Sequence, residues 1–472
     1  STATPQIGAG TLSSVSFSSA AASTAGVSGL ATVAFTTVGQ VSVGGKVVVT
    51  FPAHGETPEH GFKSDGDTPA VLFTTPSDGT KPTATGAFPA GRVLTLTTTG
   101  SNKLLQGVAH AFTIADLRNP SSVVAAATVA VETQDAASKA CDGPTSTATP
   151  QIAVGTIGGT KSFVGTVKTP GVKGNHLLSF STVGQVPKAG GKVLLLLPAS
   201  FTESPTQTYT MDSPVVTFTS PAANAGVASA AFNTRTLTVT MDGTGSNAGL
   251  GQGVACAMKV TNVRTPSSIV ASVSTSEITT TDAANKNVDT VATVATDDVV
   301  AGSLTSMSFS SAAAATAGVS GLATVAFTTA GQVSVGGKVV VTFPAHSESP
   351  TFGFKSDGDT PAVLFTTPSD GTKPTATGAF PAGRVLTLTT TGSNKLLQGV
   401  AHAFTIADLR NPSSVVAAAT VAVETQDAAS KACDGPTSTA TPQIGAGTLS
   451  SVSFSSAAAA TAGVSGLATV AF

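Results

Sequence analysis

The chain has 472 residues, of which 41% are hydrophobic and only 10% are charged, and its formal net charge is −2 at pH 7. This combination argues against intrinsic disorder, which couples low hydrophobicity to high net charge. The near-zero charge, without a Lys/Arg cluster among aromatic residues, also argues against nucleic acid as a partner. No stretch reaches the roughly 20 apolar residues needed to span a bilayer, so we expect no membrane span in this chain.

Long internal repeats organise the sequence. The segment around Phe35 returns around Phe180, Phe327 and Phe472, each time with similar neighbours. Each repeat has the length of an ordinary domain of about 150 residues. We therefore predict repeat 1 at residues 1–145, a divergent repeat 2 at 146–292, repeat 3 as a near-copy of repeat 1 at 293–437, and the opening strands of an incomplete repeat 4 at 438–472.

The first repeat opens with a Thr/Pro/Gly segment at 1–10, which is typical of a linker. The first strand is predicted at 12–17. In the second, at 29–37, Val33 and Phe35 share one face at the period of two that a strand requires.

The stretch at 44–52, GGKVVVTFP, joins a Gly-Gly turn to a short aliphatic run that ends at a proline. It returns at 190–198 as GGKVLLLLP and unchanged at 336–344. Such a run is typical of a buried strand and is too short for a membrane helix. The copies keep side chains of similar apolar volume while the residue types change. A hydrophobic core tolerates such changes, whereas a binding site does not. Further strands are predicted at 70–74, 92–99, 108–117 and 122–132, and loops at 53–69 and 76–89.

The predicted fold class is all-β. About seven short strands per repeat, separated by turn signals, are typical of an immunoglobulin-like β-sandwich. The abundance of Thr, Ser, Val and Gly favours strands and turns over helices. We predict tandem immunoglobulin-like β-sandwich domains of about seven strands each, joined by Thr/Pro linkers and arranged as an extended rod.

Four aspartates are candidate calcium ligands, because they stand in closely spaced pairs in equivalent loops: Asp65, Asp67, Asp357 and Asp359. A calcium site needs six to eight oxygens and usually a bidentate acid further along, and no acid follows soon in either loop. The pattern therefore favours an Asp-Gly surface turn, with calcium as the weaker alternative. We expect no cofactor.

No catalytic residues are predicted. The chain has no Gly-x-Ser-x-Gly elbow before a helix and no phosphate-binding glycine loop. His110 and His402 lie within predicted strands at the place where repeat 2 has Cys256, which favours a packed position over a general base. We therefore expect that the protein is not an enzyme.

Two of the three cysteines, Cys141 and Cys433, occupy the same place in repeats 1 and 3. A disulfide between Cys141 and Cys256 would tie the end of repeat 1 to repeat 2. The alternative is that all three cysteines are free or bonded to another chain. Spacing alone leaves both open.

One arginine precedes a proline-containing turn in every repeat, at Arg118, Arg264 and Arg410. A recognition point is one interpretation. The favoured interpretation is structural, because a guanidinium fork can tie the turn to a neighbouring loop or unit.

The tandem repeats and the Thr/Ala/Val/Gly bias make the chain resemble tandem immunoglobulin-like stalk proteins of cell surfaces. It is also similar to extracellular surface or flagellar-hair fibre proteins of unicellular algae and to microbial adhesin stalks. We expect a non-enzymatic structural subunit of an extracellular filament, fibre or surface coat, with copies of itself or neighbouring chains as partners. Pairs such as Thr4-Pro5 and Thr149-Pro150 are typical of O-glycosylated stalks, so O-linked glycans are expected too.

The alternative is a cell-surface adhesin stalk. Its charged loops, at 53–69, 199–214 and 345–361, would bind a glycan or another surface ligand. Sugar sites usually need an aromatic platform, and the chain has no Trp and one Tyr.

Overall fold

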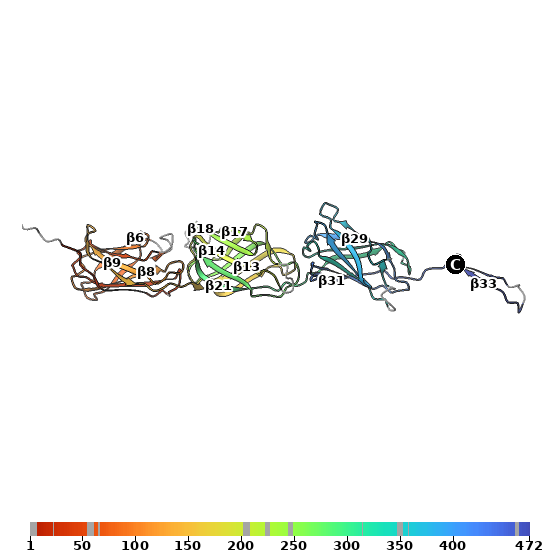
Figure 1. Ribbon diagram of the computed structural model, residues 1–472, viewed down its shortest axis with the longest axis horizontal. Coiled ribbons are helices and arrows are strands. Elements are labelled where there is room, and N and C mark those ends of the chain that lie inside the picture. The colour runs from red at the N-terminus through yellow and green to blue at the C-terminus, as the bar shows by residue number, and fades with distance from the viewer. Residues whose placement is uncertain are drawn as a thin grey trace, which may run out of the picture.

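The computed structural model describes residues 7–21, 23–53, 61–64, 67–201, 208–221, 227–243, 249–313, 315–346, 353–356, 358–457 and 462–472. The regular secondary structure of this part consists of β-strands alone, which confirms the all-β class. The described residues include no helix long and apolar enough to cross a membrane. Figure 1 shows three β-sandwiches in a row, followed by a separate hairpin. We call the sandwiches unit 1 (β1–β10), unit 2 (β11–β21) and unit 3 (β22–β31).

Unit 1 consists of two five-stranded antiparallel sheets. In one, β1, β2 and β8 are neighbours, and β4 and β5 both pair with β8; the other has the order β10-β9-β3-β7-β6. The strands are β1 Ser13–Ser19, β2 Ser28–Thr36, β3 Lys46–Thr50, β4 Lys63–Ser64, β5 Val71–Thr75, β6 Thr83–Ala90, β7 Val93–Thr99, β8 Ala109–Arg118, β9 Thr128–Gln134 and β10 Ala140–Ala148.

Unit 3 repeats this topology strand for strand. Its strands are β22 Thr305–Ser311, β23 Ser320–Thr328, β24 Lys338–Thr342, β25 Lys355–Ser356, β26 Val363–Thr367, β27 Thr375–Ala382, β28 Val385–Thr391, β29 Ala401–Arg410, β30 Thr420–Gln426 and β31 Ala432–Ala440. The hairpin beyond it consists of β32 Ser453–Ser456 and β33 Ala468–Ala471.

Unit 2 differs because its two sheets are joined into one of eleven strands. The joint is a parallel pairing between β12 and β21, with Ser162 opposite Ala295 and Phe163 opposite Thr296. The strands are β11 Gly155–Thr156, β12 Gly158–Gly165, β13 Lys173–Ser181, β14 Ala189–Leu196, β15 Thr210–Met211, β16 Val216–Ser220, β17 Val227–Asn233, β18 Thr236–Asp242, β19 Ala255–Arg264, β20 Ser276–Thr281 and β21 Asn287–Thr296.

The repeated aliphatic stretch forms the central strand of its sheet, because β3 lies between β7 and β9. Val47 and Val49 point into the sandwich and are fully buried, as is Phe51 just after the strand. In unit 2 the corresponding Val193 and Leu195 are buried in the same way. The buried strand predicted from this stretch is confirmed.

Three strands of unit 1 occupy segments where none was predicted. β4 lies in the predicted loop at 53–69 and pairs with β8, β6 lies in the predicted loop at 76–89 and pairs with β7, and β10 crosses the predicted end of repeat 1 at residue 145 and pairs with β9. β6 and β10 are the edge strands of one sheet. An edge strand needs ladder bonds on one side only and therefore tolerates prolines such as Pro89 and Pro144. Units 1 and 3 thus have ten strands each.

The segment after β10 completes the core of the unit that precedes it. Ile152 is fully buried with the core of unit 1, and its backbone exchanges two hydrogen bonds with Val124, at 2.8 and 3.1 Å. Val299 and Ile444 take the same place in units 2 and 3. The predicted Thr/Pro linker is therefore a fixed segment, because one of its aliphatic residues closes an end of the sandwich.

Histidines are packed inside all three units. His110 and His402 lie in the cores of units 1 and 3 at 1% exposure, and Cys256 takes this place in unit 2, which confirms the packed position. A further histidine, His176 of unit 2, stacks on Phe163 with ring centroids 4.8 Å apart and meets Tyr209 edge-on. Burial lowers the pKa of His176 to about 4, although the nearby Asp297 carboxylate opposes the shift.

We expect Ile152→Ala to destabilise unit 1 by about 2–5 kcal/mol, because it removes a buried aliphatic side chain from the core. Hydrogen exchange of the β1 amides checks this, since the β1 sequence differs from that of its counterpart β22. Ile7→Ala is the matched control, because Ile7 is 95% exposed. Equal exchange rates in the two variants would contradict the assignment of Ile152 to the core.

We expect the stability of unit 2 to fall as the pH drops from 6.5 towards 4. The unfolded chain protonates His176 near pH 6.5, whereas the folded unit does so only near its lowered pKa of about 4. The loss is up to about 3 kcal/mol. Tyr209 is the only tyrosine in a chain without tryptophan, so its fluorescence during urea unfolding reports on unit 2 alone. His176→Leu should flatten this pH dependence; an unchanged slope would contradict the prediction.

Candidate interface between the repeat units

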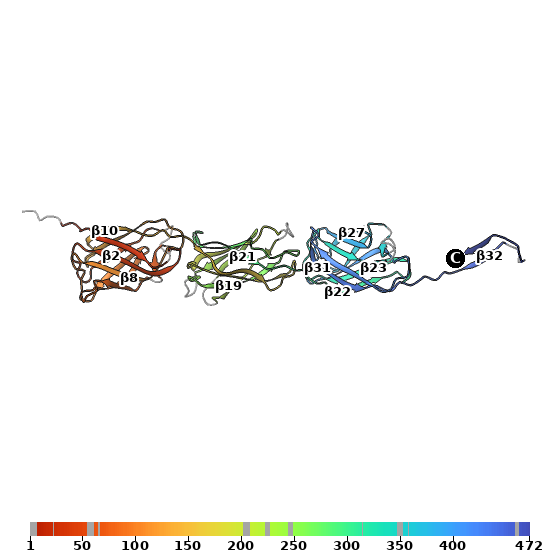
Figure 2. The ribbon, with the colours of Figure 1, turned by 90° about the horizontal axis from the view of Figure 1, so that it is seen from below.

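Neighbouring units meet through opposite ends of the sandwiches (Figure 2). One surface, the tail face, consists of the residues that lead into β2 and the turn that follows β8, or their counterparts in the other units. The other surface, the head face, consists of a Gly-Gln turn, a second glutamine and the turn that joins the last two strands of the unit. The tail faces lie at 25–28 with 120–122 in unit 1, 170–173 with 266–268 in unit 2, and 317–320 with 412–414 in unit 3; the head faces lie at 39–40, 106 and 135–141 in unit 1, 184–185, 252 and 282–288 in unit 2, and 331–332, 398 and 427–433 in unit 3.

Backbone and side-chain hydrogen bonds join the tail face of unit 1 to the head face of unit 2. The Gln185 N–H donates to the Gly26 carbonyl at 2.9 Å, and the Ser28 N–H donates to Gln252 Oε1 at 2.7 Å. The Arg118 guanidinium donates to Gln185 Oε1 at 2.7 Å. These contacts fix the Gly-Gln turn of unit 2 against the residues of unit 1 that lead into β2.

The junction between units 2 and 3 repeats two of these bonds with different side chains around them. The Gln332 N–H donates to the Gly171 carbonyl at 3.2 Å, and the Lys173 N–H donates to Gln398 Oε1 at 2.9 Å. A further backbone bond runs from the Ile269 N–H to the Ala432 carbonyl at 3.0 Å. The docking geometry is therefore shared by both junctions.

Glycine is required where the two faces touch. A Cβ on Gly184 would lie 2.0 Å from the Ala25 carbonyl oxygen, and one on Gly331 would lie 1.7 Å from the Pro170 carbonyl oxygen. No side chain fits at such distances from another unit's backbone. Both head turns can therefore approach the preceding unit only as glycine.

A buried aspartate in each unit supports the head turn from inside. Asp142, Asp289 and Asp434 are fully buried. The Asp142 carboxylate accepts the Gly39 N–H at 3.1 Å, and the Asp289 carboxylate accepts the Gly184 N–H at 3.2 Å. Burial raises the pKa of Asp289 and of Asp434, while hydrogen bonds to the carboxylates oppose the shift. The carboxylates thus hold the turn amides in the docking geometry.

The cysteines are free in the structure, and the candidate bridge between Cys141 and Cys256 is not formed. Cys256 lies inside the core of unit 2 on β19, whereas Cys141 packs at the edge of the core of unit 1 on β10, so the two belong to separate cores. Burial raises the pKa of Cys256 to about 12. The thiol of Cys433 donates to the Ser267 carbonyl across the junction between units 2 and 3.

The burial of one head-face position depends on docking. Cys433 of unit 3 is 1% exposed, and Val288, its counterpart in unit 2, is fully buried. Cys141 holds the same position at the uncovered head face of unit 1 and is only half-buried. Because units 1 and 3 are near-copies, the difference follows from the presence of a preceding unit.

The three predicted turn arginines lie at the tail faces. Arg118 reaches Gln185 of the next unit, and Arg264 donates to the Gly171 carbonyl at 2.5 Å, the same carbonyl that accepts the Gln332 N–H. Arg410 ends β29 at the corresponding place in unit 3. These bonds support the structural role that we propose for all three arginines.

A bulge shapes the strand end that presents each of these arginines. Two residues before the arginine, Asp116, Asn262 and Asp408 have φ angles of 51°, 61° and 50°. Asp and Asn tolerate this left-handed region better than most residues. The sequence pattern Asp/Asn-x-Arg thus marks a bulged strand end.

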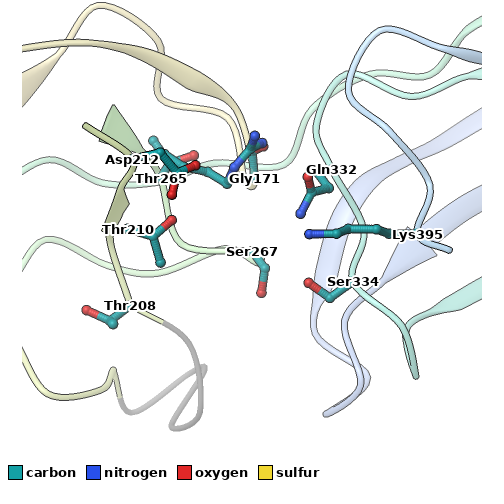
Figure 3. A pocket seen from close by; sticks show the side chains of 10 residues that line it. Gly171, Thr208, Thr210, Asp212, Thr265, Ser267, Gln332, Ser334 and Lys395 are labelled. Atoms are coloured by element: carbon teal, nitrogen blue, oxygen red, sulfur yellow. The ribbon is translucent and has the colours of Figure 1, made fainter. Parts of the chain in front are cut away.

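A polar cavity of about 380 Å³ lies between units 2 and 3. Lys395 of unit 3 extends into it toward unit 2 beside Gln332, and Ser267 and Asp212 line the opposite wall (Figure 3). The lining of this cavity adds little apolar burial to the junction. Hydrogen bonds and the close fit of the glycine turns contribute to its stabilisation.

The calcium candidates are only partly described. Asp65 and Asp357 lie outside the described residues, as do large parts of the charged loops. Asp67 and Asp359 are exposed, and their carboxylates pair with Lys63 at 3.0 Å and with Lys355 at 2.9 Å. In the part of the chain that the structure describes, no three His, Cys, Asp or Glu side chains form a possible metal site. Calcium binding there stays an untested prediction.

No family model and no curated protein matches the sequence. Solved structures are similar at low identity. The N-terminal domain of the Streptococcus gordonii adhesin Sgo0707 is 11% identical over 93% of this chain and 90% of that chain, with a TM-score of 0.24. The C-terminal domain of the Streptococcus pyogenes antigen I/II-family protein AspA is 10% identical over 62% of this chain and 98% of that chain, with a TM-score of 0.20. TM-scores this low carry no argument about the function of this chain.

We expect Gly331→Ala to open the junction between units 2 and 3 without unfolding either unit, because the three atoms nearest to the added Cβ all belong to unit 2. Cys433 should then react with an alkylating reagent at a rate within a few-fold of that of Cys141, as measured by peptide mass spectrometry. Gly371→Ala is the control, because a Cβ there meets no atom within 4 Å. Continued protection of Cys433 in Gly331→Ala would show that the turn is not required for docking.

Proposed function

We propose that the chain is a non-enzymatic structural subunit of an extracellular filament, fibre or surface coat. The observation that carries the proposal is that both junctions use the same faces and the same backbone bond to a tail glycine, Gly26 or Gly171. Docked junctions of this kind keep successive sandwiches in a row. A row of sandwiches sets a fixed distance between its ends, which is the task of a stalk or fibre.

The surface of the first and last strands of unit 1 supports close packing with neighbouring chains. Their outward positions are small, as at Ser16 and Ser18 of β1 and Ser146 and Ala148 of β10, all exposed. Side chains of this size let strands of neighbouring chains approach closely, and uncharged edges do not repel one another. Copies of this chain or neighbouring chains are therefore the proposed partners.

O-linked glycans are a further part of the proposal, with restricted positions. Thr149 is only 3% exposed and its hydroxyl accepts the Ala127 N–H, so its Thr-Pro pair does not offer a free hydroxyl. Exposed serines such as Ser16 remain accessible acceptors. An intact mass equal to the 46.0 kDa polypeptide in protein from its natural source would exclude the glycans.

We expect small-angle X-ray scattering of the dilute protein to show an elongated particle with the three units in a row. The reason is that each junction is fixed by backbone hydrogen bonds and by a short, bound connecting segment. A double variant, Gly184→Ala with Gly331→Ala, should broaden the distance distribution, while Gly79→Ala with Gly371→Ala should leave it unchanged. A wild-type distribution typical of freely jointed units would contradict the proposed role.

A further inference from the structure

The two internal junctions differ in how their polar side chains are paired. At the junction of units 1 and 2, the Arg118 guanidinium donates to Gln185 Oε1 at 2.7 Å. The buried Ser121 hydroxyl donates to the Asp282 carboxylate of unit 2 at 3.3 Å. The glutamine of the head turn and the serine of the tail turn are thus both satisfied by direct bonds within the protein.

At the junction of units 2 and 3 the equivalent side chains lack these partners. Arg264 donates to the Gly171 carbonyl instead of to a glutamine. Among the described residues, no hydrogen bond reaches the side-chain amide of Gln332, the counterpart of Gln185. Ser267, the counterpart of Ser121, is 8% exposed, and its buried hydroxyl has no partner. Buried polar atoms in native proteins usually have a partner, and where the protein supplies none, a bound water or ion often does.

A lysine of unit 3 brings a positive charge to the same place. Figure 3 shows Lys395 extended across the polar cavity toward Ser267, with Gln332 beside it. Its ammonium forms no ion pair with any described residue. In unit 2 the equivalent position is Gly249, where a Cβ would lie 2.1 Å from the Val186 carbonyl oxygen, so that no lysine fits there. The cation is therefore particular to the junction of units 2 and 3.

The lining of the cavity favours an anion. Its charged groups are two cations, Arg264 and Lys395, and one carboxylate, that of the exposed Asp212, so its net formal charge is positive. An ammonium and a guanidinium only donate hydrogen bonds, and the Gln332 amide and the Ser267 hydroxyl donate as well. Hydrogen bonds from charged donors to an anionic oxygen are the strong ones. The volume of about 380 Å³ leaves room for a hydrated anion or for an anionic group attached to a sugar.

We propose that the cavity between units 2 and 3 binds a small oxyanion, held by Lys395 and Gln332 of unit 3 and by Ser267 of unit 2. An anion in this place bonds both units at once and therefore fastens the junction. The oxyanion is either a free ion, such as sulfate, or the same group on an acidic glycan. This inference goes beyond the proposed structural role, because docking of the units as described needs no ligand.

The test uses Cys433 as a reporter of this junction. Its thiol donates to the Ser267 carbonyl and is buried, so a reagent reaches it only when the junction opens. A ligand that binds only the docked state lowers the open fraction by the factor 1 + [L]/Kd. For a Kd on the order of 1 mM, typical of a few charge-assisted bonds in a partly open site, 10 mM sodium sulfate should slow alkylation of Cys433 about tenfold. The reference is sodium chloride at equal ionic strength, in which Cys141 should react at the same rate as in sulfate.

Three variants assign the effect to the cavity. Lys395→Gln should abolish the slowing by sulfate while Cys433 stays protected in chloride, because Lys395 makes no ion pair at the docked junction. Lys103→Gln is the matched control, because Lys103 is the exposed counterpart in unit 1, and it should respond like the wild type. Asp212→Asn should lower the sulfate concentration needed by about twofold, because it removes a like charge from the lining.

Glucose 6-sulfate at the same concentration distinguishes the two sources of the oxyanion. Stronger slowing than with inorganic sulfate assigns the cavity to an acidic glycan, and equal or weaker slowing assigns it to the free ion. An unchanged Cys433 rate with both compounds would overturn the inference. Equal slowing in Lys395→Gln would also overturn it, because sulfate would then act only by its general exclusion from protein surfaces. The proposed structural role fails separately, by scattering typical of jointed units in chloride alone.

Discussion

The junctions depend on a carboxylate buried under each head turn. An amide left without an acceptor inside a protein costs about 1–3 kcal/mol, and the carboxylates of Asp142 and Asp289 remove that cost for the turn glycines. A threonine from the neighbouring strand bonds each carboxylate in turn, Thr133 in unit 1 and Thr280 in unit 2. The interior of a unit thus sets the shape of the surface that meets the next unit.

Fold and junction are also coupled through the connecting segments. Ile152, Val299 and Ile444 are buried in the core of the unit that precedes them. Each unit therefore fixes the beginning of the segment that follows it. The covalent connection then brings the two faces together at high effective concentration, so a few hydrogen bonds suffice to dock them. A polar cavity can remain at such a junction without releasing it.

Much of the fold follows from the sequence, and less of the interface does. Strict alternation predicted β2 and β7, and the repeated stretch predicted β3, because burial on one face determines those side chains. β6 and β10 were missed because edge strands tolerate the prolines that signal loops, and the two-residue strand β4 was missed because it is too short to show alternation. The Gly-Gln turn recurs visibly at Gly39, Gly184 and Gly331, yet its role lies in contacts with another unit, which periodicity within a unit does not record.

The parallel pairing in unit 2 has a mechanical consequence. The strands β11 and β12 at the start of unit 2 both run in the same direction as β21 at its end, and the chain enters unit 2 before them and leaves it after β21. Tension along the chain therefore pulls them past each other, so that the bonds near Ser162 and Phe163 are loaded together and not one after another. In units 1 and 3 the corresponding strands belong to different sheets, and only a single parallel bridge joins the entry segment to the last strand, at Gly10 with Asp142 and at Gly302 with Asp434. Under a stretching force, unit 2 thus has a longer parallel pairing to resist the pull than its neighbours have.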